Sequence, residues 1–303
     1  MAGDPPPPRR ITPFEPPSFA GGARFPLDDA AIVARVHDAL DEDRAFDDVT
    51  TIATIHSGRH QRALLVAREP GVVAGVPLAL AAFRLLDERV EIRVDAEDGT
   101  AVARGATVLF ISGHARGILS AERVALNFLQ RLSGIATLTR RYVDAVRGTR
   151  AAILDTRKTT PGWRRLEKYA VHCGGGVNHR MDLASAVLIK DNHLAAVDGD
   201  VAAAVRRVRE YATRRLAVQV ECDTPAQVRA AVEAGADSVL LDNMSLDQLR
   251  DSVAIAAGRC VTEASGGVTL STVRAIAETG VDRISVGALT HSPRALDLGL
   301  DFE

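Results

Sequence analysis

Cysteine, net charge and long apolar runs are all scarce in this sequence, and each scarcity excludes a class of protein. The three cysteines, Cys173, Cys222 and Cys260, are far apart and odd in number, so no disulfide framework is expected and a reducing cytoplasm is the predicted compartment. The formal net charge of −2 gives no general attraction for nucleic acid. No apolar run is long enough to cross a membrane. Any anion that this protein binds must therefore meet a local cluster of cations.

The composition is that of a globular protein. Of 303 residues, 47% are hydrophobic and 25% are charged, which suits one large domain or two moderate ones. Residues 1–24 are rich in proline and lack the apolar segment of a signal peptide, so they predict a mobile arm. We expect a mixed α+β domain at 25–133, an α/β barrel at 134–290, and a C-terminal segment at 291–303 that packs back on the first domain.

The first half of the chain mixes helical and strand-like periodicity. Helical spacing of apolar residues covers 27–41 and 77–86. Short strands are predicted at 62–68, 90–94 and 107–111. Ser120 is the predicted N-cap of a long helix that runs toward Val146, with a bend expected near Gly134. Together these elements predict the smaller α+β domain.

In the second half, short apolar strands alternate with amphipathic helices. Strands are predicted at 153–155, 187–189, 217–220, 238–241, 260–262 and 283–286. The helices predicted at 225–234 and 270–279 each end at a glycine, Gly235 or Gly280. This alternation predicts a parallel sheet curled into an α/β barrel.

Polar residues follow the predicted strands at their carboxyl ends, which is where α/β barrels build their active sites. The first strand runs into the residues 155–158, with the sequence DTRK. The later strands run into Lys190, Glu221, Asp242, the segment 263–267 and Gly287. Because these ends converge, we expect cations to face carboxylates across one pocket.

The expected cation cluster contains four permanent charges and one histidine. Its members are Arg157, Lys158, Arg180 and Lys190, with His179. Arginine binds carboxylate or phosphate through two parallel hydrogen bonds, and lysine adds a point charge. One such cation would be an ordinary solvated surface group, but four beside strand ends or glycine loops predict a small polyanionic ligand.

Glu221 and Asp242 carry the opposite charge. Carboxylates beside an anion site suit Mg²⁺, bound directly or through water, whereas the alternative is that they only form ion pairs with the lysines. The glycine loops at 264–268 and 285–289 can bind a phosphate through backbone N–H groups. The triple glycine within 172–180 lets the backbone pass close to a ligand.

Two other kinds of site are disfavoured. A zinc site built from His172, Cys173, His179 and His193 fits no structural-zinc spacing and lacks a paired CxxC. Cys173 has no partnered base that would make it a nucleophile, so a buried thiol is expected.

Several segments resemble the quinolinate phosphoribosyltransferase family. They are DTRKTTPGWRRLEKYAVHCGGGVNHR, MDLASAVLIKDNH, VECDT, VLLDNM, EASGGV and ISVGALTHSPRALDLGLDF. The resemblance runs from about Leu27 to the last residues, and the block 155–193 is the most specific part. Glycine usually precedes the aspartate where this chain has DDVTT (47–51), and His172 stands where arginine is common. Neither departure touches the residues at the strand ends.

The resemblance implies phosphoribosyl transfer from 5-phosphoribosyl-1-pyrophosphate to quinolinate with decarboxylation, a step of NAD biosynthesis that yields nicotinate mononucleotide. It implies that the quinolinate carboxylates are held by Arg123, Arg157, His179, Arg180 and Lys190. It implies that the 5-phosphate is received by Ser265, Gly266, Gly287 and Ala288. Lys158 and Lys190 would lie near the pyrophosphate and the reacting centre, while Glu221 and Asp242 would serve the ribose hydroxyls and Mg²⁺.

The resemblance also implies a homodimer, or a hexamer built of dimers, in which Arg123 crosses the interface. Three other functions stay open at this point. One is a molybdenum-associated paralogue of the same family. Another is an aldolase-like barrel with Lys190 as a Schiff-base lysine, which leaves the cation cluster unexplained. The last is a non-catalytic sensor of phosphorylated metabolites, which has no obvious need for Glu221 and Asp242.

Overall fold

The computed structural model describes residues 24–211 and 216–303, which form two compact units that are considered separately. One unit, the α+β unit, comprises residues 24–141, 158–176 and 288–303. The other, the barrel unit, comprises 142–157, 177–211 and 216–287. Apart from Arg24, the predicted proline-rich arm lies outside the described residues.

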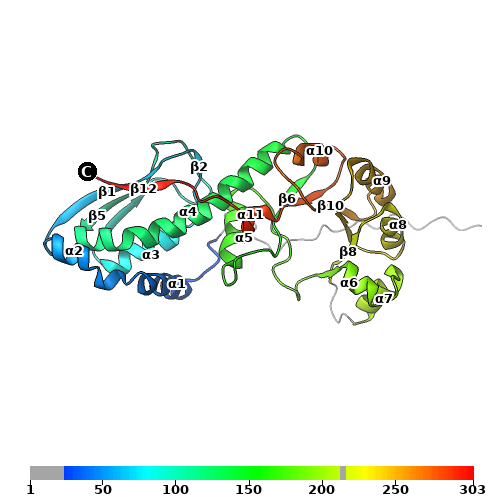
Figure 1. The fold of residues 1–303 in the computed structure, drawn as a ribbon, viewed down its shortest axis with the longest axis horizontal. Helices are drawn as coiled ribbons and strands as arrows, with labels where there is room; N and C mark the ends of the chain where they lie inside the picture. The colour runs from blue at the N-terminus through cyan, green and yellow to red at the C-terminus, as the bar shows by residue number, and fades with distance from the viewer. Residues whose placement is uncertain (1–23, 212–215) are drawn as a thin grey trace, which may run out of the picture. The chain divides into compact units, whose positions relative to one another are not determined.

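The α+β unit contains a four-stranded antiparallel sheet with the strand order β12-β1-β5-β3 (Figure 1). Its strands are β1 (His60–Ala67), β3 (Glu91–Val94), β5 (Thr107–His114) and β12 (Leu298–Phe302). Strand β12 pairs with β1 from Ala63↔Phe302 to Ala67↔Leu298, so the last residues of the chain complete a sheet that begins near residue 60. A separate pair joins β2 (Gly71–Val72) to β4 (Ala101–Val102).

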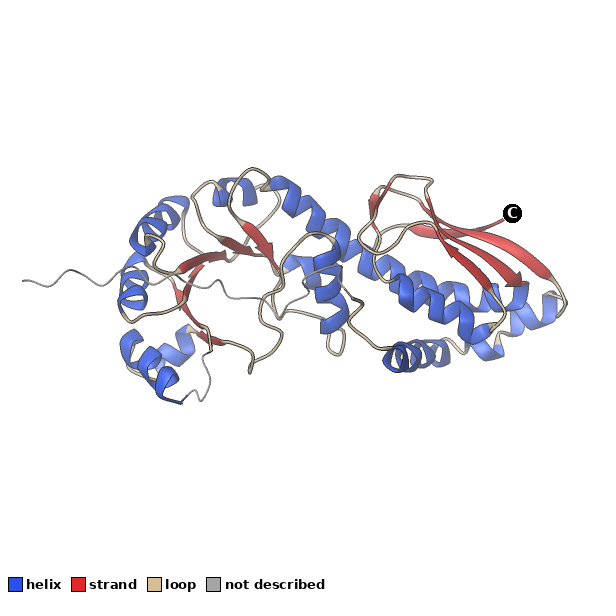
Figure 2. Ribbon diagram, turned by 180° about the vertical axis from the view of Figure 1, so that it is seen from behind, coloured by secondary structure: helices blue, strands red, loops and turns tan. Residues whose placement is uncertain are grey.

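Helices α3 (Val76–Leu86) and α4 (Ala115–Ala145) cover one face of this sheet (Figure 2). The predicted N-cap at Ser120 is wrong, because α4 begins five residues earlier, directly after β5. Ser120 instead lies inside the helix, where its hydroxyl donates to Asp48 Oδ2 over 2.9 Å. The boundary expected between residues 133 and 134 also falls inside α4.

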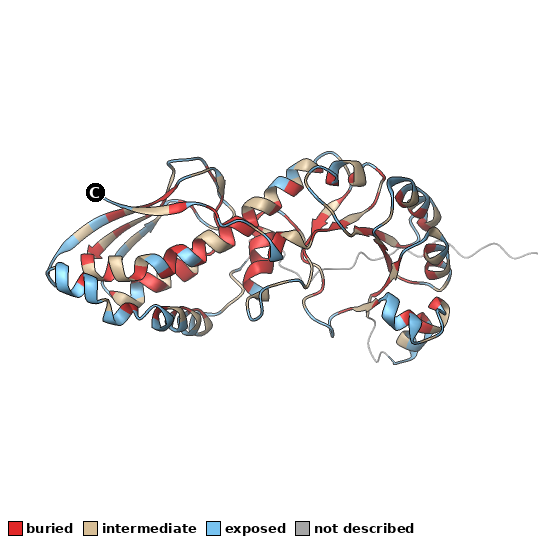
Figure 3. Cartoon of the chain, in the orientation of Figure 1, coloured by how far each residue is buried: buried red, intermediate tan, exposed pale blue. Residues whose placement is uncertain are grey.

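Gly134 lies in the middle of α4, which is one uninterrupted helix with much of its surface buried (Figure 3). A Cβ atom at this position would meet the carbonyl oxygen of Arg294 at 2.2 Å. The glycine therefore allows the C-terminal segment to approach the helix backbone closely. The sequence signal that suggested a bend reflects this close packing.

Further helices complete the α+β unit. They are α1 (Asp29–Glu42), α2 (Val49–Thr54), α5 (Arg164–Cys173) and α11 (Ala288–His291). Of these, only α1 was predicted. It begins at the N-cap Asp28, whose carboxylate accepts a hydrogen bond from the backbone amide of Ala31.

The barrel unit contains six parallel strands with the order β6-β11-β10-β9-β8-β7. They are β6 (Ala152–Leu154), β7 (Val187–Ile189), β8 (Val218–Cys222), β9 (Ser238–Asp242), β10 (Val261–Ser265) and β11 (Arg283–Ser285). The helices between them are α6 (Asp191–Ala195), α7 (Val201–Tyr211), α8 (Pro225–Glu233), α9 (Leu246–Ala256) and α10 (Val273–Ala277). All six predicted strands are confirmed, and so is the α/β class, although α10 is shorter than predicted.

The edge strands of this sheet are β6 and β7, and no ladder joins them within the described residues. On this side, the segment that follows Gly176 runs beside β6. Val177 forms an isolated parallel bridge with Leu154, and its backbone amide donates to the carbonyl of Ile153. The ring of strands is thus continued by an irregular segment that carries His179 and Arg180.

The buried core of both units is mainly apolar, with a few buried polar and charged side chains. Over the described residues, no helix combines the length and the hydropathy needed to cross a membrane. Cys173, Cys222 and Cys260 are all buried free thiols.

Candidate active site

The carboxyl ends of the barrel strands bring most of the predicted site residues together. Asp242 and Ser265 end β9 and β10 in register with each other, and Glu221 is the last residue but one of the neighbouring strand β8. Glu221 is in register with Leu240, two residues before Asp242, so the three side chains point to the same face of the sheet, with Glu221 one step nearer the middle of its strand. Lys190 follows β7, the strand next to β8.

Lys190 and Glu221 form an ion pair across two adjacent strand ends. Lys190 Nζ lies 3.1 Å from Glu221 Oε2, with the lysine half exposed and the carboxylate largely buried. The backbone amide of Lys190 also donates to His193 Nδ1 over 3.0 Å at the start of α6. The ammonium group is therefore held at the edge of the barrel mouth, next to a negative charge.

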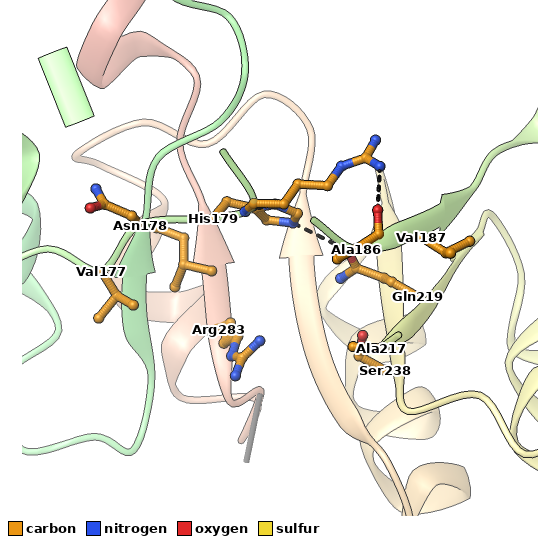
Figure 4. A pocket seen from close by; sticks show the side chains of 11 residues that line it. Val177, Asn178, His179, Ala186, Val187, Ala217, Gln219, Ser238 and Arg283 are labelled. Atoms are coloured by element: carbon orange, nitrogen blue, oxygen red, sulfur yellow. Dashed lines mark hydrogen bonds between the residues drawn. The ribbon is translucent and has the colours of Figure 1, made fainter. Parts of the chain in front are cut away.

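Arg157 follows β6, Arg180 lies on the segment beside β6, and their like charges are close enough to affect each other. Arg180 is buried, and its guanidinium donates to the carbonyl of Ala186 over 2.9 Å (Figure 4). Burial, followed by the charge of Arg157, lowers the pKa of Arg180, while Asp182 acts in the opposite direction. Two partly buried guanidinium groups that repel each other are chemically suited to bind a dianion.

Buried Asp155 anchors the segment that carries Arg180. Its Oδ2 accepts from Asn178 Nδ2 over 2.6 Å, and its Oδ1 accepts from the backbone amide of His179 over 2.8 Å. Asp155 follows β6 directly, so a residue at one strand end holds the neighbouring segment in place.

His179 lies with its ring between the backbone of Arg180 and the barrel interior. Its Nδ1 accepts from the backbone amide of Arg180 over 2.7 Å. Its Nε2 lies 3.2 Å from Gln219 Oε1 (Figure 4) and 3.4 Å from Oε1 of the buried Glu263. Burial alone would raise the pKa of Glu263, but hydrogen bonds from His179, Ser285 and Gln219 outweigh it and lower the pKa.

The glycine loop after β10 has the backbone conformation that a phosphate site needs. Gly266 has φ +94° and Gly267 has φ +57°, both in the left-handed region. A Cβ at Gly266 would meet Asn243 Oδ1 at 2.2 Å, whereas a Cβ at Gly267 would meet nothing within 4 Å. Asn243 in turn donates to Asp242 Oδ2 over 2.7 Å. Gly266, in the loop after β10, is therefore packed directly against Asn243, the residue that follows Asp242 at the end of β9.

Three predicted site residues, Arg123, Lys158 and Ala288, belong to the α+β unit. Arg123 is exposed on α4, Lys158 is exposed in the loop before α5, and Ala288 begins α11. The backbone carbonyl of Lys158 accepts from the hydroxyl of Thr290 over 2.7 Å.

A buried ion pair that the sequence did not predict supports the loop after Lys158. Glu167 is fully buried and accepts from Arg131 over 2.6 Å, and from both the amide and the hydroxyl of Thr160. Arg131 also donates to the carbonyl of Thr290. No local pattern distinguishes Glu167 from a surface glutamate, because its partners Arg131 and Thr160 come from two other segments.

The triple glycine lies against α4. A Cβ at Gly174 would meet the carbonyl oxygen of Ala136 at 2.4 Å, and one at Gly176 would meet Val171 and Thr139 within 2.8 Å. The close approach predicted for a ligand is thus an approach to a helix. Burial raises the pKa of nearby Cys173 to about 12, which keeps this thiol protonated at neutral pH.

Among the residues that the structure describes, no three His, Cys, Asp or Glu side chains gather closely enough to hold a metal ion by themselves. Glu221 and Asp242 nevertheless present two carboxylates at adjacent strand ends. This number fits Mg²⁺, which is usually shared between one or two protein carboxylates, water and substrate phosphates.

Comparison with known proteins identifies the family. The C-terminal domain model of quinolinate phosphoribosyl transferase matches residues 135–301, and the N-terminal domain model matches residues 48–133. The chain belongs to the quinolinate phosphoribosyl transferase family. Both domains of the family are present in the same order.

Individual relatives agree with this assignment. The nicotinate-nucleotide pyrophosphorylase [carboxylating] of Mycobacterium leprae is 48% identical over 275 residues, covering 87% of this chain and 94% of the relative. The probable enzyme of the same name from Bacillus subtilis is 42% identical, covering 86% and 89%. The solved nicotinate-nucleotide pyrophosphorylase of Francisella tularensis superposes with a TM-score of 0.86 at 37% identity, covering 93% of this chain and all of that one.

Proposed function

We propose that this protein transfers the phosphoribosyl group of 5-phosphoribosyl-1-pyrophosphate to quinolinate and releases pyrophosphate and CO₂, giving nicotinate mononucleotide for NAD biosynthesis. The observation that carries the proposal is the paired, partly buried guanidinium groups of Arg157 and Arg180. They lie in the same barrel unit as the Lys190–Glu221 ion pair and the Gly266 loop. The arginines suit a dianion, Glu221 suits the ribose hydroxyls, and the Gly266 loop suits a phosphate.

In the proposed reaction the quinolinate nitrogen attacks C1 of the ribose as the bond to pyrophosphate breaks. The ribose carbon becomes positively charged in the transition state, and the carboxylates of Glu221 and Asp242 stabilise that charge. The cations of Lys190 and Lys158 stabilise the leaving pyrophosphate. The positively charged ring nitrogen then stabilises the electron pair that stays on C2 when CO₂ departs, and a proton adds to C2 in place of the carboxylate. No protein nucleophile is required.

Lys190 is better suited to this role than to Schiff-base chemistry. Its Nζ forms an ion pair with Glu221, whereas a Schiff-base lysine attacks a carbonyl through a neutral amine. Arg157 and Arg180 would also have no role in such a reaction.

We propose Mg²⁺ as the metal of this site. Glu221 and Asp242 would hold it, directly or through water, together with oxygens of the phosphoribosyl substrate. Bound there, the ion would neutralise charge on the leaving pyrophosphate. The finding that supports this is the pair of carboxylates on neighbouring strands.

We further propose a homodimer, or a hexamer of dimers, in which Arg123 reaches the site of the partner subunit. Arg123 is exposed and lines a pocket on the α+β unit together with Asp47, Asp48 and Ser120. Three apolar side chains in the same stretch of sequence as Asp47 and Asp48 are also exposed. They are Phe46, Val49 and Ile52, with 46%, 77% and 49% of their surface exposed. Apolar groups next to an exposed arginine support a protein partner, and a second copy of the chain is the one proposed.

The proposed location is the cytoplasm, where three unpaired thiols would stay reduced. Quinolinate and 5-phosphoribosyl-1-pyrophosphate are the proposed small-molecule partners. Neither nucleic acid nor a membrane is part of the proposal, because the net charge is −2.

The deciding experiment incubates the protein with quinolinate, 5-phosphoribosyl-1-pyrophosphate and Mg²⁺ and measures nicotinate mononucleotide and pyrophosphate. Equal amounts of both products are expected. A protein that binds both substrates without product would be a sensor, and one that turns over only another pyridine or pyrrole acid would be a paralogue. Either outcome contradicts the proposal.

A further inference from the structure

Four polar side chains form a connected layer just below the strand-end residues of the barrel. Gln219 and Glu263 precede Glu221 and Ser265 by two residues on the same strands, so they face the barrel interior one layer deeper. Gln219 Nε2 donates to Glu263 Oε2 over 2.9 Å, and the hydroxyl of Ser285 donates to Glu263 Oε1. His179 is the fourth member, through the contacts of its Nε2 with Gln219 and Glu263. Glu263 is the hub of this layer.

The hydrogen bonds determine which nitrogen of His179 carries the proton. Nδ1 accepts the backbone N–H of Arg180, so Nδ1 must present a lone pair. A neutral imidazole then carries its proton on Nε2, which faces the two acceptor oxygens of Gln219 and Glu263. Both ring nitrogens are thus engaged inside the protein, one with the Arg180 backbone and one with the buried layer.

The hydrogen bonds that this layer donates to Glu263 require its carboxylate to be ionised. It is fully buried, yet it accepts hydrogen bonds from three side chains, as an ionised carboxylate does. A buried carboxylate with this many donors is an organising centre, since loss of its charge would leave donors without an acceptor.

The layer is linked to the anion site through one residue. The ring of His179 holds the backbone amide of Arg180, and Asp155 holds the backbone amide of His179. The Arg180 guanidinium bonds the carbonyl of Ala186 and lies close enough to Arg157 for the two charges to affect each other. The position of the Arg180 backbone therefore depends on the orientation of an imidazole that Glu263 restrains from below.

We propose that Glu263 is a positioning residue for quinolinate binding. It holds the Nε2–H of His179, which turns Nδ1 toward the amide of Arg180 and fixes that arginine beside Arg157. His179 then acts on the substrate through Arg180, and its ring does not donate a hydrogen bond to a quinolinate carboxylate. This inference rests on the proposed function, because quinolinate is the ligand whose binding is measured.

The kinetic test compares Glu263→Gln with wild type. A glutamine offers one acceptor oxygen where the carboxylate offers two, so it cannot accept from Gln219, Ser285 and His179 together. The KM for quinolinate should rise at least about tenfold, because a hydrogen bond to a charged group is lost, while the KM for 5-phosphoribosyl-1-pyrophosphate stays within about twofold. An equal rise for both substrates would overturn the proposal.

Ser285→Ala is the matched control. It removes a different hydrogen bond to the same carboxylate, one that does not involve His179. It should lower the melting temperature and leave the quinolinate KM within about twofold. A Ser285→Ala variant that weakens quinolinate as much as Glu263→Gln would mean that any damage to the layer has this effect, which also contradicts the proposal.

A double-mutant cycle separates positioning from direct contact. If His179 acts through the chain Glu263–His179–Arg180, then Glu263→Gln combined with His179→Asn should weaken quinolinate no more than the more damaging single change. Effects that multiply would show two independent contributions and would overturn the proposal.

The ring itself can be observed without any activity. In protein labelled with ¹⁵N-histidine, the His179 signals are those that disappear in His179→Asn. At pH 7 they should show a neutral ring with its proton on Nε2, and a proton on Nδ1 would refute the arrangement even if the Glu263 variants fail to fold. A wild-type protein that does not convert quinolinate would refute the proposed function instead, and the ring tautomer would still decide whether Glu263 restrains His179.

Discussion

Lys190 Nζ lies 3.1 Å from Glu221 Oε2. This ion pair links the carboxyl ends of the adjacent strands β7 and β8, with the cation following β7 and the anion near the end of β8. In the proposed reaction, Glu221 stabilises the positive charge that develops on the ribose, and Lys190 stabilises the negative charge that develops on the leaving pyrophosphate. The ion pair therefore keeps the two groups ready and balances their charges when substrate is absent.

Replacing Lys190 by methionine should reduce turnover by at least about 100-fold, because a cation near the leaving group is lost. The melting temperature should change little, since a half-exposed ion pair contributes only about 0–1 kcal/mol. Steady-state kinetics and calorimetry measure the two effects. Arg274→Ala, which breaks the exposed pair with Glu278 in the same unit, is the control and should alter neither. A Lys190 variant with normal turnover would remove this lysine from the mechanism.

Glu221→Gln combined with Asp242→Asn should lower turnover by at least about 100-fold and shift the Mg²⁺ concentration that is needed for activity. The amides keep the size of the side chains and remove their charge. Quinolinate binding, measured by titration calorimetry without the second substrate, should stay close to that of wild type. Normal turnover with an unchanged metal requirement would contradict both proposed roles.

Arg180→Ala should weaken quinolinate far more than 5-phosphoribosyl-1-pyrophosphate. Removing a guanidinium group that faces a carboxylate in a partly buried site costs about 2–5 kcal/mol of binding free energy. Binding of each substrate is measured separately. Arg209→Ala, which removes an arginine paired with Asp237 elsewhere in the barrel unit, should affect neither. Equal losses for both substrates would show that Arg180 does not recognise quinolinate.

Gly266→Ala should raise the KM for 5-phosphoribosyl-1-pyrophosphate and lower the melting temperature. An alanine there would combine a left-handed backbone with a contact of 2.2 Å to Asn243. Gly267→Ala introduces only the backbone cost, about 1–2 kcal/mol, because nothing lies near its Cβ. The Gly267 variant should therefore be clearly milder in both measurements, and the reverse order would contradict the proposed phosphate loop.

Mixing two inactive variants tests whether Arg123 serves the partner subunit. Arg123→Ala and Lys190→Ala should each be nearly inactive alone. In a mixed dimer with shared sites, one site carries both changes and the other carries neither, so random co-assembly should restore about a quarter of full activity. Separately tagged variants allow the mixed dimers to be isolated and assayed. If verified mixed dimers stay inactive, Arg123 acts within its own chain.

Much of the barrel could be predicted from local patterns. Short runs such as SVLL at 238–241 are too apolar and too brief to be anything but buried strands, and the helix at 225–234 carries its own cap and stop signals. Once the strands are parallel, their last residues must meet, so Glu221, Asp242 and Ser265 could be grouped from the sequence alone.

The errors arose where a distant segment decides the local structure. Ser120 has the chemistry of an N-cap, but β5 leads straight into α4, and the hydroxyl binds Asp48 from a turn 72 residues earlier. Gly134 and Gly174 looked like a bend and a ligand-binding loop. Each instead permits backbone of another segment to approach α4, which periodicity cannot reveal.

The sequence by itself determined the order of strands and helices, and with it the charged groups that end each strand, because both follow from local hydrophobic spacing and from the parallel arrangement. The tertiary structure alone decided which of those groups are paired. That Glu263 accepts from Gln219, Ser285 and His179, and that the His179 ring faces the amide of Arg180, depends on side chains from β8, β10, β11 and the segment after Gly176 meeting in the barrel interior. Such contacts are set by packing between residues far apart in the chain, and no local pattern records them.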